Sequence, residues 1–139
     1  MRTCGSTTHS PSHRGRGKPY RILCVDDQEP VSQALRCVLD QAGYVVECVA
    51  DGQQALDRII ADLTFFDLLI IDHQMPRLSG LALVGHLRKA SFPGRIIVQG
   101  SALSAEEISA YRTLGVDHVV FKPAKLAALL NCVDCSTSN

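Results

Sequence analysis

Residues 68–76 read Leu68-Leu69-Ile70-Ile71-Asp72-His73-Gln74-Met75-Pro76, and the rest of the chain can be understood from this segment. Four consecutive apolar residues that end on one carboxylate and run into turn residues indicate a fully buried strand of a parallel sheet. Open α/β sheets bind their ligands outside the carboxyl ends of their strands. The segment therefore places Asp72 where a ligand site is expected.

The composition is that of one globular domain. The chain has 139 residues, of which 46% are hydrophobic and 20% charged, and its formal net charge is zero. No acidic residue precedes Asp26, so the start is basic, the remainder is acidic, and direct binding of nucleic acid is not expected. We interpret residues 1–18 as a disordered basic tail or a vector-derived remnant, and residues 136–139 as a C-terminal tail.

The apolar runs are too short for a membrane span, which needs roughly 18–20 residues, and the N-terminus lacks the apolar region of a secretory signal. We therefore expect a cytoplasmic protein without membrane contact, whose six cysteines are reduced thiols. Cys24, Cys37 and Cys48 have apolar neighbours and are expected to pack as small hydrophobic residues. The Cys132-x-x-Cys135 spacing stands alone and is a weak signal for a metal or redox site.

Strand patterns and helix patterns alternate along the chain from Tyr20 onward. The predicted strands are residues 20–25, 44–49, 67–72, 95–99 and 117–121. The predicted helices begin near Pro30, Asp51, Leu81, Ser104 and Leu126, with Asp51 and the Ser104–Glu107 capping box at two N-termini. The second helix is expected to bury Leu56, Ile59, Ile60 and Leu63. The alternation predicts an α/β fold, a doubly wound parallel sheet with helices on both faces.

Polar residues follow most of the predicted strands at the point where each strand ends. They are Asp26 and Asp27, Asp72, Ser101 and Lys122. Each alone has an ordinary explanation as a helix cap, a turn residue or a solvated charge, but the ends of parallel strands meet at one edge. Three neighbouring carboxylates require a proton or a cation, and Mg²⁺ is the natural candidate. An ammonium and a hydroxyl suit phosphoryl oxygens, so the set predicts phosphoryl transfer onto a carboxylate.

These motifs together resemble those of the response-regulator receiver domains of two-component phosphorelay systems. The resemblance covers residues 19–135 and rests on Asp26-Asp27, Asp72 with Met75-Pro76 and Gly80, Ser101-Ala102, and Lys122-Pro123. It implies a five-stranded flavodoxin/CheY-like (βα)5 fold with strand order 2-1-3-4-5. It also implies a signalling domain that phosphorylates and dephosphorylates itself and is not a classical enzyme.

The resemblance implies a role for each residue. Asp72 would accept phosphate from a histidine kinase or a histidine phosphotransfer protein, and Lys122 and Ser101 would hold the phosphoryl group. Asp27, Asp72 and the backbone carbonyl of Gln74 would bind Mg²⁺, with Asp26 acting through a water molecule. The Lys122–Pro123 bond would be cis. A downstream protein would dock on the face formed by the fourth helix, the fifth strand and the fifth helix.

Some positions depart from the family pattern. Val119 stands where many members carry an aromatic residue that moves on phosphorylation, so we expect the signal to pass through residues 101–104 and the helix that follows. Gln74 and Leu103 flank the path of the attacking water in the family, which leaves the lifetime of the phosphoryl group open. His73, beside Asp72, is interpreted as a residue at the rim of the site.

Three alternative functions have weaker support. A pseudo-receiver, which is a phosphate-independent interaction module on the same fold, is favoured by Val119 and disfavoured by the complete acidic and lysine set. A haloacid-dehalogenase-like hydrolase needs a second acid two residues after its nucleophile, and neither Gln28 nor Glu29 with its following residues fits that pattern. A dinucleotide-binding fold is disfavoured because no Gly-x-Gly-x-x-Gly follows the first strand.

Overall fold

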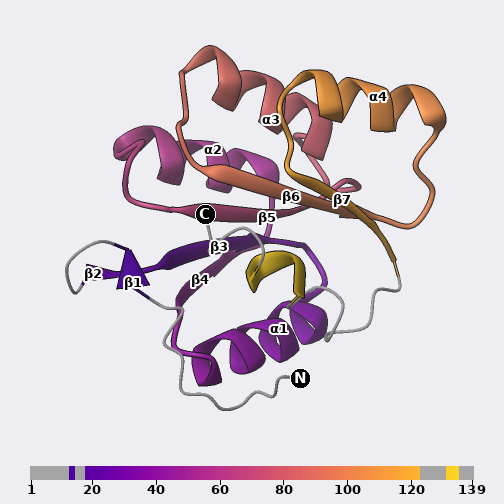
Figure 1. Cartoon of the computed structure of the whole chain (residues 1–139). Helices are drawn as coiled ribbons and strands as arrows, with labels where there is room; N and C mark the ends of the chain where they lie inside the picture. Colours follow the sequence, from indigo (N-terminus) through magenta and orange to yellow (C-terminus); the bar gives the residue numbers. More distant parts are fainter. Residues whose placement is uncertain (1–12, 15–17, 123–130, 135–139) are drawn as a thin grey trace.

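A parallel sheet of five strands, in the order β4-β3-β5-β6-β7, forms the centre of the described part of the chain (Figure 1). The computed structural model describes residues 13–14, 18–122 and 131–134. The strands are β3 (Arg21–Val25), β4 (Val45–Val49), β5 (Leu68–Asp72), β6 (Arg95–Gly100) and β7 (His118–Phe121). Numbered along the chain, this is the predicted order 2-1-3-4-5, which confirms the doubly wound α/β fold.

Strand β5 lies at the middle of the sheet, where the sequence places its most apolar run. It pairs with β3 in the register Val25↔Ile71 and with β6 in the register Asp72↔Gln99. All of its side chains are buried, and even Asp72 is only 4% exposed. A strand with neighbours on both sides and helices on both faces has no solvent-facing side, which explains the absence of polar alternation.

The helices are α1 (Glu29–Gln41), α2 (Gly52–Ala61), α3 (Gly80–Lys89) and α4 (Ala105–Thr113), and residues 131–134 are also helical. Figure 1 shows α2, α3 and α4 on one face of the sheet and α1 with residues 131–134 on the other. Both predicted caps are confirmed, since Asp51 accepts from the Gln54 N–H at 2.8 Å and Ser104 accepts from the Glu107 N–H at 3.1 Å. Residues 123–130, where the fifth helix was predicted to begin, lie outside the described residues.

Each face of the sheet has its own hydrophobic core. The face with α2, α3 and α4 buries residues such as Ile71, Leu83 and Tyr111, and the α1 face buries residues such as Ile70, Leu39 and Val133. The prediction for α2 was wrong at Ile60, which is 48% exposed, whereas Ala55 is fully buried. The buried side of α2 runs through Gly52, Ala55 and Ile59, and Ile60 is turned one residue, about 100°, away from Ile59.

The cysteine prediction holds only in part. Cys24 is buried and Cys48 is partly buried on the α1 face, but Cys37 is exposed on the outer side of α1. Cys132 packs against the same core, and its motif partner Cys135 lies outside the described residues. Cys24, Cys37 and Cys48 are thiols outside any disulfide.

Two smaller findings concern the rest of the chain. Within the segment interpreted as a tail, β1 (His13–Arg14) pairs antiparallel with β2 (Lys18–Pro19). Across the described residues, every helix is too short or too polar to cross a lipid bilayer.

Glycine at position 80 permits the close approach of α3 to the end of β5. A Cβ there would lie 2.8 Å from the Asp72 carbonyl oxygen and 2.9 Å from the Tyr111 hydroxyl, both too short. By contrast, a Cβ on Gly85 in the same helix would meet no atom within 4 Å. The start of α3 therefore requires glycine for space, while the middle does not.

We predict that Gly80→Ala and Gly85→Ala change stability in opposite directions. Gly80→Ala should lower the free energy of unfolding by about 1–3 kcal/mol, because the methyl group forces α3 away from β5. Gly85→Ala should raise it by about 0.5–1 kcal/mol, because alanine has the higher helix propensity. Urea unfolding followed by circular dichroism measures both, and equal effects of the two variants would contradict this view of α3.

Candidate functional site

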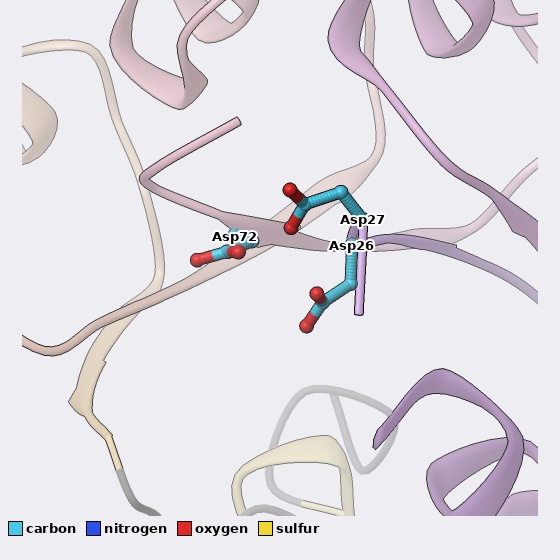
Figure 2. A group of neighbouring side chains, drawn as sticks. All are labelled: Asp26, Asp27 and Asp72. Carbon is cyan, nitrogen blue, oxygen red and sulfur yellow. The ribbon is translucent and has the colours of Figure 1, made fainter. Parts of the chain in front are cut away.

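The ends of β3 and β5 bring three carboxylates together. The register Val25↔Ile71 places the residues that follow, Asp26 and Asp72, side by side, and Asp27 comes next. Oxygen atoms of the three side chains lie within 4.8 Å of one another. Figure 2 shows that the two side chains from β3 and the one from β5 extend into the same region. Asp26 and Asp72 are each 4% exposed, whereas Asp27 is open to solvent.

Lys122 reaches this cluster from the far edge of the sheet. It follows β7, and its backbone N–H donates to the Gly100 carbonyl at 2.8 Å, which fixes its position beside the end of β6. Its Nζ lies 3.2 Å from Asp26 Oδ2 and 3.3 Å from Asp72 Oδ2. One ammonium thus bridges the two buried carboxylates and compensates part of their charge.

Asp72 is held in an environment that disfavours its charged form. Burial raises the pKa of Asp72 above its ordinary 3.8, and the neighbouring Asp26 charge adds to the rise. The Lys122 ammonium and the Gln74 backbone N–H act in the opposite direction without cancelling the shift. A carboxylate that is poorly solvated and fixed in position is well suited to attack an electrophile or to bind a cation.

The remaining predicted site residues lie at the same edge of the sheet. Ser101 directly follows β6, and its side chain is exposed. Gln74 is exposed in the loop after β5, where its N–H lies 3.4 Å from Asp72 Oδ1. The Lys122–Pro123 bond falls partly outside the described residues. Val119 is half-buried against the core under α4, as ordinary strand packing requires.

His73 is not a rim residue, and the prediction was wrong. Its side chain is buried, with Nδ1 2.5 Å from the Tyr111 hydroxyl and Nε2 3.1 Å from Glu107 Oε2. Side chains alternate along a strand, so His73 points to the face opposite Asp72, toward α4. That alternation was available from the sequence, but the partners on α4 depend on a contact across more than thirty residues.

A cleft of about 460 Å³ opens beside the carboxylates. It is lined by residues of the β3 end, the loop after β5 and α4, among them Asp27, His73, Gln74, Ser79 and Glu107. The exposed Asp27 therefore faces a space that can admit a group from another molecule.

The three carboxylates are suited to hold a divalent cation. Mg²⁺ binds oxygen ligands at about 2.1 Å, so two opposite ligands lie about 4.2 Å apart. The oxygens of Asp26, Asp27 and Asp72 already lie within 4.8 Å of one another, and all are hard donors. The residues present therefore fit such an ion with little rearrangement.

Comparison with known proteins agrees with this geometry. The family model described as "Response regulator receiver domain" matches residues 22–134. A response regulator MprA from Mycolicibacterium vanbaalenii is 39% identical over 112 residues, which are 81% of this chain and 48% of that protein. Its Mycobacterium tuberculosis counterpart is 40% identical over 110 residues, 79% of this chain and 47% of that protein. The chain thus spans about half the length of these curated relatives.

Solved structures show the same architecture. The chemotaxis protein CheY4 of Vibrio cholerae is 28% identical, with a TM-score of 0.76 over 84% of this chain and 98% of that chain. A response regulator from Burkholderia pseudomallei, solved with a phosphorylated aspartic acid, calcium ion and citrate, is 25% identical, with a TM-score of 0.74 over 86% of this chain and 69% of that chain. By its sequence match, its strand order and its structural neighbours, the chain belongs to the response regulator receiver domain family of two-component systems.

Proposed function

We propose that Asp72 accepts a phosphoryl group from a histidine of a partner kinase or phosphotransfer protein, in a reaction that depends on Mg²⁺. The observation that carries the proposal is the position of Asp72. It is a buried carboxylate at the end of the central strand, within 4.8 Å of two other carboxylates and 3.3 Å from the Lys122 ammonium. The Burkholderia pseudomallei relative, which carries a phosphorylated aspartic acid and a calcium ion, supports the same chemistry here.

The proposed transfer uses groups already in place. A carboxylate oxygen of Asp72 attacks the phosphorus of the donor phosphohistidine, and the bond between phosphorus and the imidazole nitrogen breaks. The electron pair of the broken bond stays on the imidazole nitrogen, and the imidazole then takes up a proton. Lys122 exchanges its contact with Asp72 for one with a phosphoryl oxygen, and Ser101 donates to another. The cleft lined by Asp27, Gln74 and Ser79 lies beside the cluster and would admit part of the donor protein.

The metal ion has a defined place in this proposal. Asp27, Asp72 and the Gln74 carbonyl would bind Mg²⁺ directly, and Asp26 through a water molecule. When bound, Mg²⁺ compensates the negative charge on the carboxylates and on the transferred phosphoryl oxygens. Among the described residues, these three acidic side chains form the one group that could hold a metal ion.

The proposed output is a change at the surface that includes α4. A shallow groove of about 510 Å³ runs along its outer side and is lined by Ala105, Ile108, Ser109, Arg112 and Thr113. We propose that a downstream protein docks on the face formed by α4, β7 and the helix that contains residues 131–134. The phosphate-independent interaction module would keep this surface without modification of Asp72.

The first prediction concerns the phosphorylated residue. Asp72→Asn keeps the size of the side chain but replaces the nucleophilic oxygen, so the rate of phosphorylation by acetyl phosphate with Mg²⁺ should fall to about 1% of the parent rate or less. Intact-protein mass spectrometry measures the gain of one phosphoryl group. Asp57→Asn, which changes an exposed aspartate on α2, is the matched control and should react like the parent. Equal rates for Asp72→Asn and the parent would exclude Asp72.

The second prediction concerns the metal ion. Mg²⁺ at 100 times its dissociation constant should raise the free energy of unfolding by about 2.7 kcal/mol, because it binds only the folded chain. Thermal unfolding with and without Mg²⁺ measures the effect. Asp27→Ala should remove most of the increase, and Asp57→Ala should retain it. A melting temperature that ignores Mg²⁺ in the parent would contradict the site.

The third prediction follows from the raised pKa of Asp72. The folded chain holds this proton more tightly than the unfolded chain, so the carboxyl costs stability once the pH exceeds its ordinary 3.8, and the cost grows until the folded-state pKa is passed. In EDTA at pH 7, Asp72→Asn should therefore melt at a higher temperature than the parent. The difference should shrink as the pH falls below 4. A lower melting temperature for Asp72→Asn at pH 7 would mean that the Lys122 pair outweighs the burial.

A further inference from the structure

A buried hydrogen-bond network ties α4 to the residue that follows Asp72. His73 is 8% exposed and Tyr111 is fully buried, and their rings meet edge to face with centroids 5.5 Å apart. The Tyr111 hydroxyl contacts His73 Nδ1 at 2.5 Å, and Glu107 Oε2 contacts His73 Nε2 at 3.1 Å. Tyr111 and Glu107 lie one helical turn apart on the same side of α4, so one imidazole holds the helix at two points.

The directions of these hydrogen bonds follow from the partners. The Ser104 backbone N–H lowers the pKa of Glu107, so this side chain is ionised and can only accept. His73 Nε2 therefore donates to Glu107. In the neutral imidazole the other nitrogen, Nδ1, then accepts from the Tyr111 hydroxyl. Burial raises the pKa of Tyr111, which keeps that hydroxyl protonated and able to donate. All three side chains have complementary roles in one tautomer.

The surrounding backbone is closely packed against this network. A Cβ on Gly80 would lie 2.9 Å from the Tyr111 hydroxyl, and a Cβ on Gly100 would lie 3.0 Å from the His73 Cβ. Because both positions are glycine, the end of β6 can pack closely against His73 and the start of α3 can pack closely against Tyr111. A close-packed polar network of this kind has few alternative arrangements.

The same glutamate also takes part in the capping box at the start of α4. Glu107 Oε1 accepts from the Ser104 N–H at 2.9 Å, while Oε2 is bound to His73. Ser104 is three residues from Ser101, the hydroxyl that contacts the phosphoryl group in the proposed function. In the proposed function, a displacement of Ser101 toward Asp72 would shift Ser104 and the first turn of α4. His73 is held separately, because its backbone N–H donates to the Gln99 carbonyl of β6 at 2.8 Å.

We propose that the network of His73, Tyr111 and Glu107 is a latch that holds α4 in its phosphate-free position and opens when Asp72 is phosphorylated. This inference rests on the proposed function. The latch would do in this chain what Val119, half-buried and without a ring or a polar group, cannot do. His73 is the positioning residue: it holds α4 through Tyr111 and Glu107 and does not itself touch the reacting atoms.

The test is the affinity for beryllofluoride, a phosphoryl mimic, measured with Mg²⁺ in the full chain. Tyr111→Phe keeps the buried ring and removes one hydrogen bond of the latch. Because the latch stabilises only the phosphate-free arrangement, its loss should make beryllofluoride bind more tightly, by about 5-fold or more. In the free variant, the amide NMR signals of residues 105–113 should move toward their positions in the beryllofluoride complex of the parent.

Tyr44→Phe is the matched control. Tyr44 is also a buried tyrosine, 3% exposed, and its hydroxyl bonds Asp134 at 2.9 Å on the opposite face of the sheet. This variant should bind beryllofluoride like the parent. A purely structural role of Tyr111 would lower the melting temperature and leave the affinity equal or weaker, so only a latch predicts tighter binding.

A double-mutant cycle with His73→Phe provides the second measurement. His73→Phe removes both hydrogen bonds of the latch, including the one that Tyr111→Phe removes, so the double variant should bind beryllofluoride about as tightly as His73→Phe alone. Unchanged or weaker affinity in Tyr111→Phe, with a parent that binds normally, would overturn the latch and leave the proposed function intact. A parent that neither binds beryllofluoride nor gains phosphate at Asp72 would overturn the proposed function and the latch with it.

Discussion

The ion pair between Lys122 and the two buried carboxylates is the interaction on which the site depends. A parallel sheet brings the ends of its strands to one edge, and here that edge carries Asp26, Asp27 and Asp72. The Lys122 ammonium lies 3.2–3.3 Å from the two buried acids. Removing charges from water is costly, and one lysine does not compensate three carboxylates. In the proposed function, this residual negative charge favours a divalent cation at the site, and the bound cation would in turn compensate the negative charge of a phosphoryl group.

The central strand must therefore satisfy two opposing demands. Its apolar run gives the buried contacts that hold the sheet between two helix layers, and its last residue is a carboxylate that burial disfavours in the charged form. The buried core and the proposed phosphorylation site are therefore adjacent in the same strand. The acid stands at the very end of the strand, where ligands can reach it and the core is not interrupted.

Much of this organisation could be predicted from the sequence, because it follows from short-range patterns. Both helix caps and the convergence of the acidic residues with Lys122 follow from local sequence patterns and from the geometry of parallel strands. The strand order was implied by the resemblance to receiver domains. The errors have a different origin. Ile60 was assigned to the core because it is apolar, although the buried side of α2 passes through the smaller Ala55. His73 was placed at the rim because its partners, Tyr111 and Glu107, come from a helix more than thirty residues away. Periodicity reports the side on which a residue lies but not the identity of the side chain it meets.

Asp72 and His73 are adjacent at the end of β5, and their side chains lie on opposite faces of the sheet. Asp72 and Lys122 meet on the side that carries α1, together with Asp26, while His73 reaches the side that carries α4. Strand alternation separates the two environments by one peptide unit, so a change in charge at Asp72 lies next to the contact that positions α4 without sharing its hydrogen bonds. Because Val119 offers neither a ring nor a polar group, the proposed signal from Asp72 would travel along the backbone from β5 or from the loop after β6. Both of these segments end on Glu107, one through His73 and the other through Ser104, which makes this side chain the point where the two paths join.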